Sequence, residues 1–177
     1  MPARLTLEYD GSQFAGWARQ PGKRTVQEEL ERALSVVLRA PVALTVAGRT
    51  DAGVHALGQV ASYEGEPVAV RSVNALLPSD VSVLSCVAAP DGFDARWDAT
   101  SRAYCYRLLA RAGRPSLERD RVLWWPHAVD FEALCACADA LVGAHDFKAF
   151  TPTQTKHLRF SREVLVASWE RSGARSG

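Results

Sequence analysis

The sequence predicts an α+β protein in which helices cover one face of a mixed sheet. Strand patterns and helix patterns alternate irregularly along the 177 residues, and neither an internal repeat nor a low-complexity linker interrupts them. Apolar residues make up 47% of the chain and charged residues 23%, a balance typical of a folded protein and not of a disordered one. A chain of this length can hold one ordinary domain or two small domains that share a sheet.

Alternation of apolar and polar residues predicts the strands. The first strand runs into Asp10-Gly11-Ser12, which is a turn signal. The strand that begins at Ala103 carries Tyr104 and Tyr106 on one face. The six predicted strands are Arg4–Tyr9, Val42–Ala47, Leu57–Tyr63, Val81–Ala88, Ala103–Leu109 and Ser161–Trp169.

Three helices are predicted from capping residues and apolar spacing. Thr25 and Glu28 fit a capping box, and apolar residues follow at helical spacing until Pro41, which disfavours helix in the residue before it. A short helix is predicted at residues 70–77. Asp130 can cap a third helix.

The segment from Val46 to Gln59 reads VAGRTDAGVHALGQ and carries the strongest chemical signal. Its glycines allow tight turns, so Asp51 is presented on a short loop whose two ends are anchored in strands. Arg49 lies two residues before it, and in an extended loop its guanidinium can hydrogen-bond the carboxylate and keep it ionised. An ionised, oriented carboxylate can act as a nucleophile or as a base.

Structural alternatives fit the same spacing. Asp51 can instead form an Asx-turn with nearby backbone, which leaves Arg49 at the surface. His55 can act as a general acid–base, but a single histidine beside a strand more often packs or donates a hydrogen bond. The sequence contains no phosphate-binding glycine loop with lysine and no dinucleotide-binding glycine fingerprint, so it indicates no nucleotide cofactor.

The cysteines and the apolar runs bear on the environment of the protein. Nothing in the sequence points to secretion, so Cys86, Cys105, Cys135 and Cys137 are expected to be free thiols. Cys135 and Cys137 lie two residues apart on a predicted helix, which argues against a shared metal. The apolar runs are too short to cross a bilayer and no signal-peptide core follows Met1, so we expect a cytoplasmic protein without a membrane partner.

The net charge of +1 does not indicate a nucleic-acid-binding protein, but the charge is unevenly distributed. From Arg96 to Arg121 seven arginines stand against three acidic residues, and beyond Phe147 six basic residues stand against two acidic ones. Such patches can neutralise phosphates. They can equally be solvated faces without a ligand, and charge alone does not decide between the two.

The stretch GRTDAGVHALGQV is similar to the signature of the TruA family of tRNA pseudouridine synthases, whose catalytic aspartate is the one in GRTD. Four further stretches resemble that family in the same order along the chain. They are LEYDGSQFAGWARQPGKRTVQEELERAL, VNALLPSDV, FDARWDATSRAYCYRLL and LVGAHDFKAF. Together they extend over nearly the whole chain from Leu5 to about Trp169.

The resemblance implies that Asp51 is the catalytic residue, that Arg49 is its partner and that Tyr104 lies against the target uracil. It implies an isomerisation in which the N-glycosidic bond of a uridine breaks, the base turns and a carbon–carbon bond forms at C5. The carboxylate either adds to the base or assists its departure from the sugar. No cofactor and no metal is required. Further side chains expected at the substrate or the RNA are Arg19, Arg96, Arg102 and His55.

The resemblance also implies a partner and an architecture. The expected substrate is tRNA, modified at uridines of the anticodon stem-loop (positions 38–40 of the tRNA), and the expected assembly is a homodimer. The pseudouridine synthase fold has a mixed, mainly antiparallel central sheet and two similar halves around a cleft. Residues 1–95 would form the N-terminal half, which carries the GRTDAGVHA loop. Residues 96–177 would form an incomplete C-terminal half, because they lack the His-Met-Val-Arg run found later in the family.

Three hypotheses about function follow. The first is a tRNA-uridine isomerase that uses Asp51. The second is a catalytically inactive, RNA-binding remnant of the family. The third is an unrelated small α+β enzyme that uses Asp51 for hydrolysis. Pseudouridine formation that depends on Asp51, tRNA binding without product, or neither result would separate them.

Overall fold

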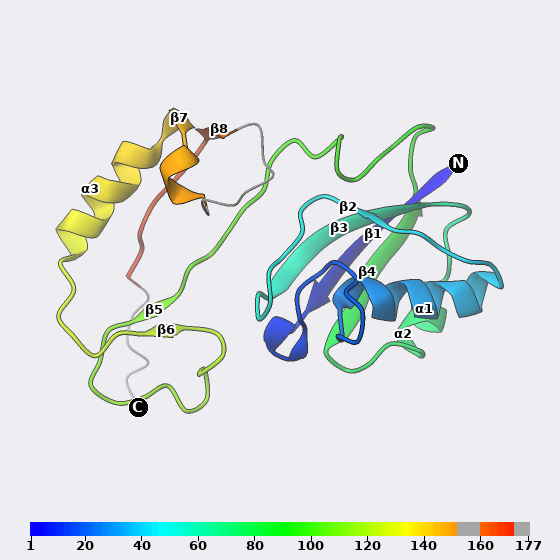
Figure 1. Cartoon of the computed structure of the whole chain (residues 1–177), viewed down its shortest axis with the longest axis horizontal. Coiled ribbons are helices and arrows are strands. Elements are labelled where there is room, and N and C mark those ends of the chain that lie inside the picture. Colours follow the sequence, from blue (N-terminus) through cyan, green and yellow to red (C-terminus); the bar gives the residue numbers. More distant parts are fainter. Residues whose placement is uncertain (152–159, 172–177) are drawn as a thin grey trace. The chain divides into compact units, whose positions relative to one another are not determined.

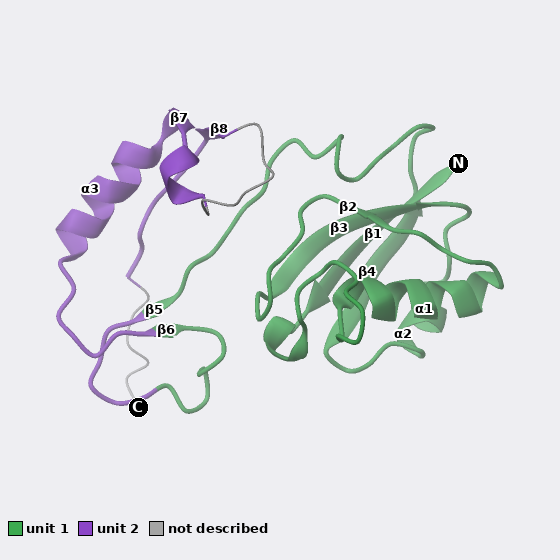
Figure 2. Ribbon diagram, viewed as in Figure 1, with its two compact units in different colours: residues 1–108, 115–123 green, residues 109–114, 124–177 purple. Residues whose placement is uncertain are grey.

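The structure is a computed structural model, and it describes residues 1–151 and 160–171 (Figure 1). Three of the basic residues beyond Phe147, namely Lys156, Arg159 and Arg175, lie outside the described residues. The chain forms two compact units (Figure 2). Unit 1 consists of residues 1–108 and 115–123, and unit 2 of residues 109–114 and 124–177. The predicted division at residues 95 and 96 concerns the two halves of the family's catalytic domain, and it stays a prediction.

Unit 1 is built on a four-stranded sheet in the order β2-β3-β1-β4. All three pairings between neighbouring strands are antiparallel, so the α+β class is confirmed but this sheet is not mixed. Parallel pairing needs a crossover connection, whereas here each strand runs against its neighbour. The elements are β1 (Pro2–Tyr9), η1 (Gly11–Gln13), α1 (Val26–Leu38), β2 (Thr45–Val46), β3 (Ala56–Glu64), α2 (Val70–Asn74) and β4 (Val81–Ala88).

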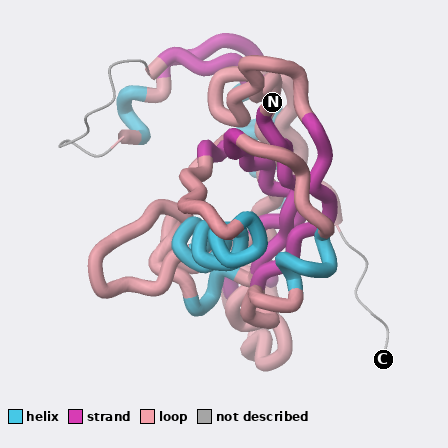
Figure 3. The backbone as a smooth tube through the Cα atoms, turned by 90° about the vertical axis from the view of Figure 1, so that its right-hand side faces the viewer, coloured by secondary structure: helices cyan, strands magenta, loops and turns pink. Residues whose placement is uncertain are grey.

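One face of the sheet carries the core of unit 1. On β1 the odd-numbered residues are buried, and Leu5 and Leu7 are completely inaccessible, while Arg4 and Glu8 on the other face are exposed. This is the alternation expected of an antiparallel strand with one solvated face. Leu30 on α1 belongs to the same buried cluster, and Figure 3 shows α1 beside the strands. Helices therefore cover one face of the sheet, as predicted.

The start of α1 differs from the predicted capping box. The Thr25 side chain makes no capping hydrogen bond, and its hydroxyl oxygen is buried without a partner in the part of the chain that the structure describes. The first free N–H groups of the helix are satisfied by the preceding loop instead. Val26 N donates to Gly16 O at 3.3 Å, and Gln27 N donates to Trp17 O at 3.1 Å. The loop backbone thus takes the place of the predicted side-chain cap.

Three predicted strands are shorter in the structure than the sequence pattern suggests. The strand expected at 42–47 is reduced to β2. A helix is shortened too, since that expected at 70–77 ends at Asn74. Of the strand expected at 103–109, only Leu108–Leu109 pairs with a neighbour, and that expected at 161–169 is strand only to Val164. A strand needs a partner for its backbone hydrogen bonds, and an alternating pattern does not show whether one is present.

The remaining elements follow β4 along the chain. They are β5 (Leu108–Leu109), β6 (Leu123–Trp124), α3 (Phe131–Leu141), β7 (Gly143–Asp146), η2 (Lys148–Phe150) and β8 (Ser161–Val164). Asp130 caps α3 as predicted, because its carboxylate accepts a hydrogen bond of 2.9 Å from Ala133 N. β7 pairs antiparallel with β8. None of the helices in the described ranges is long and apolar enough to cross a membrane.

Candidate active site

Asp51 lies on the loop that connects β2 to β3, as predicted from the sequence. The loop leaves the sheet directly after a bond from Ala47 N to Val60 O of 2.9 Å. It turns where Val54 N donates to the main-chain oxygen of Asp51 at 3.2 Å. Gly53 has a φ of +80°, the left-handed conformation that favours glycine. Local sequence therefore builds a tight turn around Asp51.

A second loop, residues 9–17, holds the backbone on both sides of Asp51. Trp17 N donates to Thr50 O at 2.9 Å, immediately before Asp51. Gly53 N donates to Phe14 O at 3.3 Å, two residues after it. The Asp51 loop is thus bound to a segment that lies far away in the sequence but contributes to the core.

Two polar side chains complete this contact, that of Tyr9, which is buried, and that of Gln59, which is half-buried. The Tyr9 hydroxyl lies 2.8 Å from Thr50 Oγ1, and the Gln59 side-chain amide donates to Gly48 O at 2.7 Å and to the Tyr9 hydroxyl at 3.3 Å. Burial raises the pKa of Tyr9, an effect that the bonds to Thr50 and Gln59 partly offset. The hydroxyl therefore keeps its proton and can donate it to Thr50.

The carboxylate of Asp51 itself is exposed and makes no hydrogen bond or ion pair among the described residues. The Asx-turn considered as an alternative is therefore not formed, since only the main chain of Asp51 takes part in the turn. Arg49 is also exposed, and its guanidinium forms no ion pair with Asp51 in the described structure. The proposed partnership of these two residues stays a prediction.

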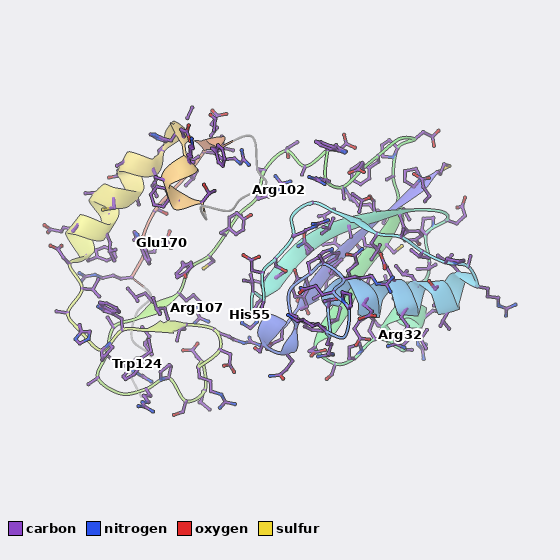
Figure 4. All side chains as sticks on the ribbon, viewed as in Figure 1. Arg32, His55, Arg102, Arg107, Trp124 and Glu170 are labelled. Carbon is purple, nitrogen blue, oxygen red and sulfur yellow. The ribbon has the colours of Figure 1, made fainter. Side chains whose placement is uncertain are left out.

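His55 is bound at both ring nitrogens by the protein. Gly11 N donates to Nδ1 at 3.2 Å, and Nε2 lies 2.6 Å from the main-chain oxygen of Asp120. Nδ1 also lies 3.2 Å from a carboxylate oxygen of Asp10. In the tautomer whose Nδ1 accepts the bond from Gly11, Nε2 carries the proton and donates it to the Asp120 oxygen. Of the two interpretations of His55, a general acid–base or a residue that packs and hydrogen-bonds, these contacts correspond to the second. Figure 4 shows the side chain beside the turn at η1.

Asp10 stands next to His55 and was not singled out as a site residue. Its carboxylate accepts bonds from the Ser12 hydroxyl at 2.5 Å and the Ser12 N–H at 3.0 Å, and from Arg121 at 3.0 Å. These bonds, from Ser12 first and then Arg121, hold the pKa of Asp10 well below its usual range, with a smaller contribution from nearby His55. Only the Asp-Gly-Ser turn signal pointed to this residue, and it gave no hint of the distant Arg121.

A cavity of about 470 Å³ opens beside Asp10 and is lined mainly by residues 116–121 with Arg107. Its three arginines already face carboxylates. Arg107 pairs with Glu118 at 2.8 Å, Arg119 with Asp120 at 3.4 Å, and Arg121 with Asp10 at 3.0 Å. The cavity therefore presents no unpaired positive charge, and Asp51 does not line it.

Arg102 is used to hold the segment after β4 against the Asp51 loop. Its guanidinium donates to Ala47 O through Nε at 2.9 Å and also through Nη2, and it lies over Gly48. The side chain extends from the stretch that follows β4 (Figure 4). Tyr104, two residues on, is 82% exposed and makes no hydrogen bond or ring contact with the residues described. Its aromatic face is free.

The other predicted RNA contacts have partners of their own. Arg19 pairs with Glu31 on α1 at 3.3 Å. The Arg96 guanidinium lies over the ring of Trp97, 5.1 Å from its centre, and that indole is 78% exposed. No group of three or more histidine, cysteine, aspartate or glutamate side chains able to hold a metal occurs among the described residues.

Comparison with known proteins gives the same assignment as the motifs. The family described as tRNA pseudouridine synthase matches residues 6–98, which is more than half of the chain. The chain is 51% identical over 154 residues to tRNA pseudouridine synthase A of Frankia casuarinae, covering 83% of this chain and 56% of that protein.

Two other relatives carry the same name. The enzyme of Nitrosomonas eutropha is 44% identical over 166 residues, covering 91% of this chain and 60% of the relative. That of Corynebacterium glutamicum is 45% identical over 186 residues, covering 96% and 64%. The chain thus spans between about half and two thirds of the length of these relatives. The third hypothesis, an enzyme unrelated to these proteins, is wrong, because the chain belongs to the tRNA pseudouridine synthase family.

Proposed function

We propose that the chain isomerises uridine to pseudouridine in the anticodon stem-loop of tRNA, with Asp51 as the catalytic carboxylate. Family membership supports the reaction class. The observation that supports the choice of Asp51 is the difference between its backbone, which is held in place, and its side chain, which is exposed. Its neighbours on both sides are hydrogen-bonded to a buried loop, whereas its carboxylate is exposed and unbound by the described residues. The backbone that carries the carboxylate is thus held in place, while the carboxylate itself is open to a substrate.

The chemistry suits an ionised carboxylate. The N-glycosidic bond of the uridine breaks, the base turns, and a carbon–carbon bond forms at C5, so that no atom is gained or lost. Asp51 would begin this reaction by adding to the base or by assisting its departure from the sugar. Tyr104 would stack on the everted uracil, since its ring is exposed and the Arg102 tether brings its segment to the Asp51 loop. Arg49 would grip the substrate phosphate or the Asp51 carboxylate.

The larger assembly is also a proposal. Residues 1–95 and 96–177 would form parts of two similar halves, with the substrate cleft between them, and two copies of the protein would bind one tRNA. Exposed arginines such as Arg96 would neutralise its phosphates.

The test compares two exposed aspartates. The chain is incubated with a tRNA transcript, and pseudouridine is mapped in the chain itself, in Asp51→Asn and in Asp91→Asn. Asp91 is exposed in the turn after β4, and its carboxylate, like that of Asp51, makes no hydrogen bond among the described residues. We expect Asp51→Asn to lower the rate by about 10²–10⁴-fold and Asp91→Asn to leave it unchanged. Equal rates for the two variants would exclude Asp51 as the catalytic group.

A second candidate is an RNA-binding protein without catalytic activity. It is favoured by the Arg96 guanidinium and the 78% exposed Trp97 ring, which lie 5.1 Å apart and could contact RNA whether or not Asp51 reacts. Tight binding of the tRNA by the unaltered chain, with no pseudouridine formed, would support this candidate in place of the first.

A further inference from the structure

We propose that residues 9–17 form a positioning platform for Asp51, in which Gly16 and Tyr9 fix the backbone that carries its carboxylate. The consequence for catalysis rests on the proposed function. The structural part of the inference does not, because it concerns only which segment holds the Asp51 loop in place.

The Asp51 carboxylate has no side-chain partner that could orient it. It makes no hydrogen bond or ion pair with the residues described, including Arg49. Its position therefore depends on the backbone of its loop. That backbone is bound to the platform at Thr50, by Trp17 N, and at Gly53, by Phe14 O. The two bonds lie on either side of Asp51 and restrict its φ and ψ.

The platform is anchored in the core, whereas the loop that it holds is at the surface. Tyr9, Phe14 and Trp17 are 4%, 3% and 1% exposed, and the rings of Tyr9 and Trp17 lie 6.1 Å apart. Residues 51–54 are all exposed. Close packing makes the buried side rigid, so it can serve as a fixed reference for the exposed side.

Two glycines of the platform pack against the loop backbone: a Cβ on Gly11 would lie 2.0 Å from Val54 O, and Gly16 faces Asp51 itself. A Cβ at this position would lie 2.8 Å from Thr50 O, 3.2 Å from Asp51 C and 3.3 Å from Ala52 N. All three are backbone atoms, so they could give way only if the Asp51 loop moved. Gly16 also has a φ of +96°, where an L-residue is strained. No side chain fits between the platform and the loop.

Gly22 offers a matched control. It has a φ of +70°, so alanine is strained there too, but no atom lies within 4 Å of the position its Cβ would occupy. Both substitutions place an L-residue at a positive φ, but only Gly16→Ala also brings a Cβ against the loop backbone. A difference between them that is confined to the Asp51 loop therefore reports on that contact.

The first readout is hydrogen exchange, which requires no activity. We expect Gly16→Ala to speed amide exchange at Gly53 and Val54, whose N–H groups donate hydrogen bonds, by about tenfold or more, and Gly22→Ala to leave these amides unchanged. Exchange at β1 should stay slow in both variants, which shows that the fold is intact. Equal exchange at Gly53 and Val54 in the two variants would overturn the platform.

The second readout is kinetic and uses a milder pair. Tyr9→Phe removes the hydroxyl that bonds Thr50 and keeps the ring. Tyr63→Phe is its control, because Tyr63 is equally buried at 3% exposure but its hydroxyl donates to Glu66 O, outside the Asp51 loop. We expect Tyr9→Phe to lower kcat by about tenfold, as loss of one positioning hydrogen bond does, without changing the Kd for tRNA. Tyr63→Phe should change neither quantity.

The outcomes separate this inference from the proposed function. If the chain forms no pseudouridine but amide exchange is faster only in Gly16→Ala, the platform is supported and the proposed function is excluded. An active chain whose kcat is the same in Tyr9→Phe and Tyr63→Phe, and whose exchange is the same in both glycine variants, keeps the function and loses the platform.

Discussion

The two units of the chain bury their apolar side chains to very different degrees. In unit 1, Leu5, Leu30 and Leu34 are 0% exposed and Trp17 is 1% exposed. Among the described residues of unit 2, the only buried apolar side chain is that of Ala138, which is 5% exposed. Both units contain an apolar helix, so the difference does not come from composition. It comes from what each helix packs against.

Helices α1 and α3 make this point directly. The apolar side of α1 joins the sheet in one buried cluster, whereas Leu141 at the end of α3 remains 40% exposed. Burial of apolar surface is the main source of folding free energy. We therefore infer that the stability of the chain resides in unit 1. The proposed catalytic loop and its platform both belong to this unit, so the carboxylate is held by the more stable part of the protein.

The largest expected effect is that of removing a core leucine. Leu34→Ala in unit 1 should lower the free energy of unfolding by about 2–5 kcal/mol, because it deletes buried methyl groups and leaves a cavity. Leu141→Ala in unit 2, the matched change, should lower it by less than about 1 kcal/mol. Urea denaturation followed by circular dichroism measures both. Similar losses for the two variants would mean that unit 2 contributes to the same cooperative core, and the comparison would fail.

A smaller effect on the free energy of unfolding is expected from removing an ion pair, and it should again depend on how far the pair is buried. Arg24 binds Asp80 through two parallel bonds of 2.7 and 2.8 Å, and the Asp80 side chain is 24% exposed. Arg107 and Glu118 form a pair of similar length, but their side chains are 51% and 47% exposed.

Asp80→Asn should therefore lower the free energy of unfolding by about 1–2 kcal/mol, since a two-bonded, partly buried pair is lost. Glu118→Gln should change it by less than about 0.5 kcal/mol, because water screens the exposed pair. Thermal unfolding at low and high salt measures both changes. A larger loss from Glu118→Gln would show that residues 115–123 are held more firmly than their exposure indicates.

The sequence predicted best the elements whose pattern and pairing are both complete. β4 has the predicted bounds Val81–Ala88, and β1 and β3 differ from the prediction by only a few residues at their ends. Each of these strands lies in the four-stranded sheet and pairs with a neighbour along most of its length. The pattern at 103–109 alternates just as well, yet only Leu108–Leu109 is strand, because local alternation does not reveal the partner.

The sequence predicted only the part of the candidate site that is encoded locally. The loop position of Asp51 follows from the glycines around it, which are local in sequence. The contact between Tyr9 and Thr50 joins residues 41 apart, and no local pattern encodes it. The unformed Thr25 cap is a further case, since the competing acceptors are carbonyl oxygens of Gly16 and Trp17. The sequence did offer one indication that this loop matters, because Gly16 and Trp17 lie in the first stretch that resembles the family.

The smallest expected effect on stability is the pH dependence that arises from Asp10. Its pKa in the folded protein is lowered, chiefly by the bonds from Ser12, while in the unfolded chain an aspartate titrates near about 3.9. The folded state therefore binds the proton less readily than the unfolded state. The resulting stabilisation is fully present above the unfolded pKa and is lost as the pH falls through the folded pKa. The effect is small because the Asp10 side chain is 35% exposed.

Two variants test this dependence. Between pH 7 and pH 3, the unaltered chain should lose stability as the pH falls below about 4, and Asp10→Asn should flatten that part of the curve because it cannot titrate. Ser12→Ala should raise the pKa of Asp10 toward its usual value, since it removes the hydroxyl bond, and carbon NMR of the Asp10 carboxyl group would record the rise directly. Two results would contradict this prediction: stability that falls with pH in Asp10→Asn just as in the unaltered chain, and an Asp10 titration that does not shift in Ser12→Ala. The turn at Asp10 would then contribute nothing to the stability of unit 1 at low pH.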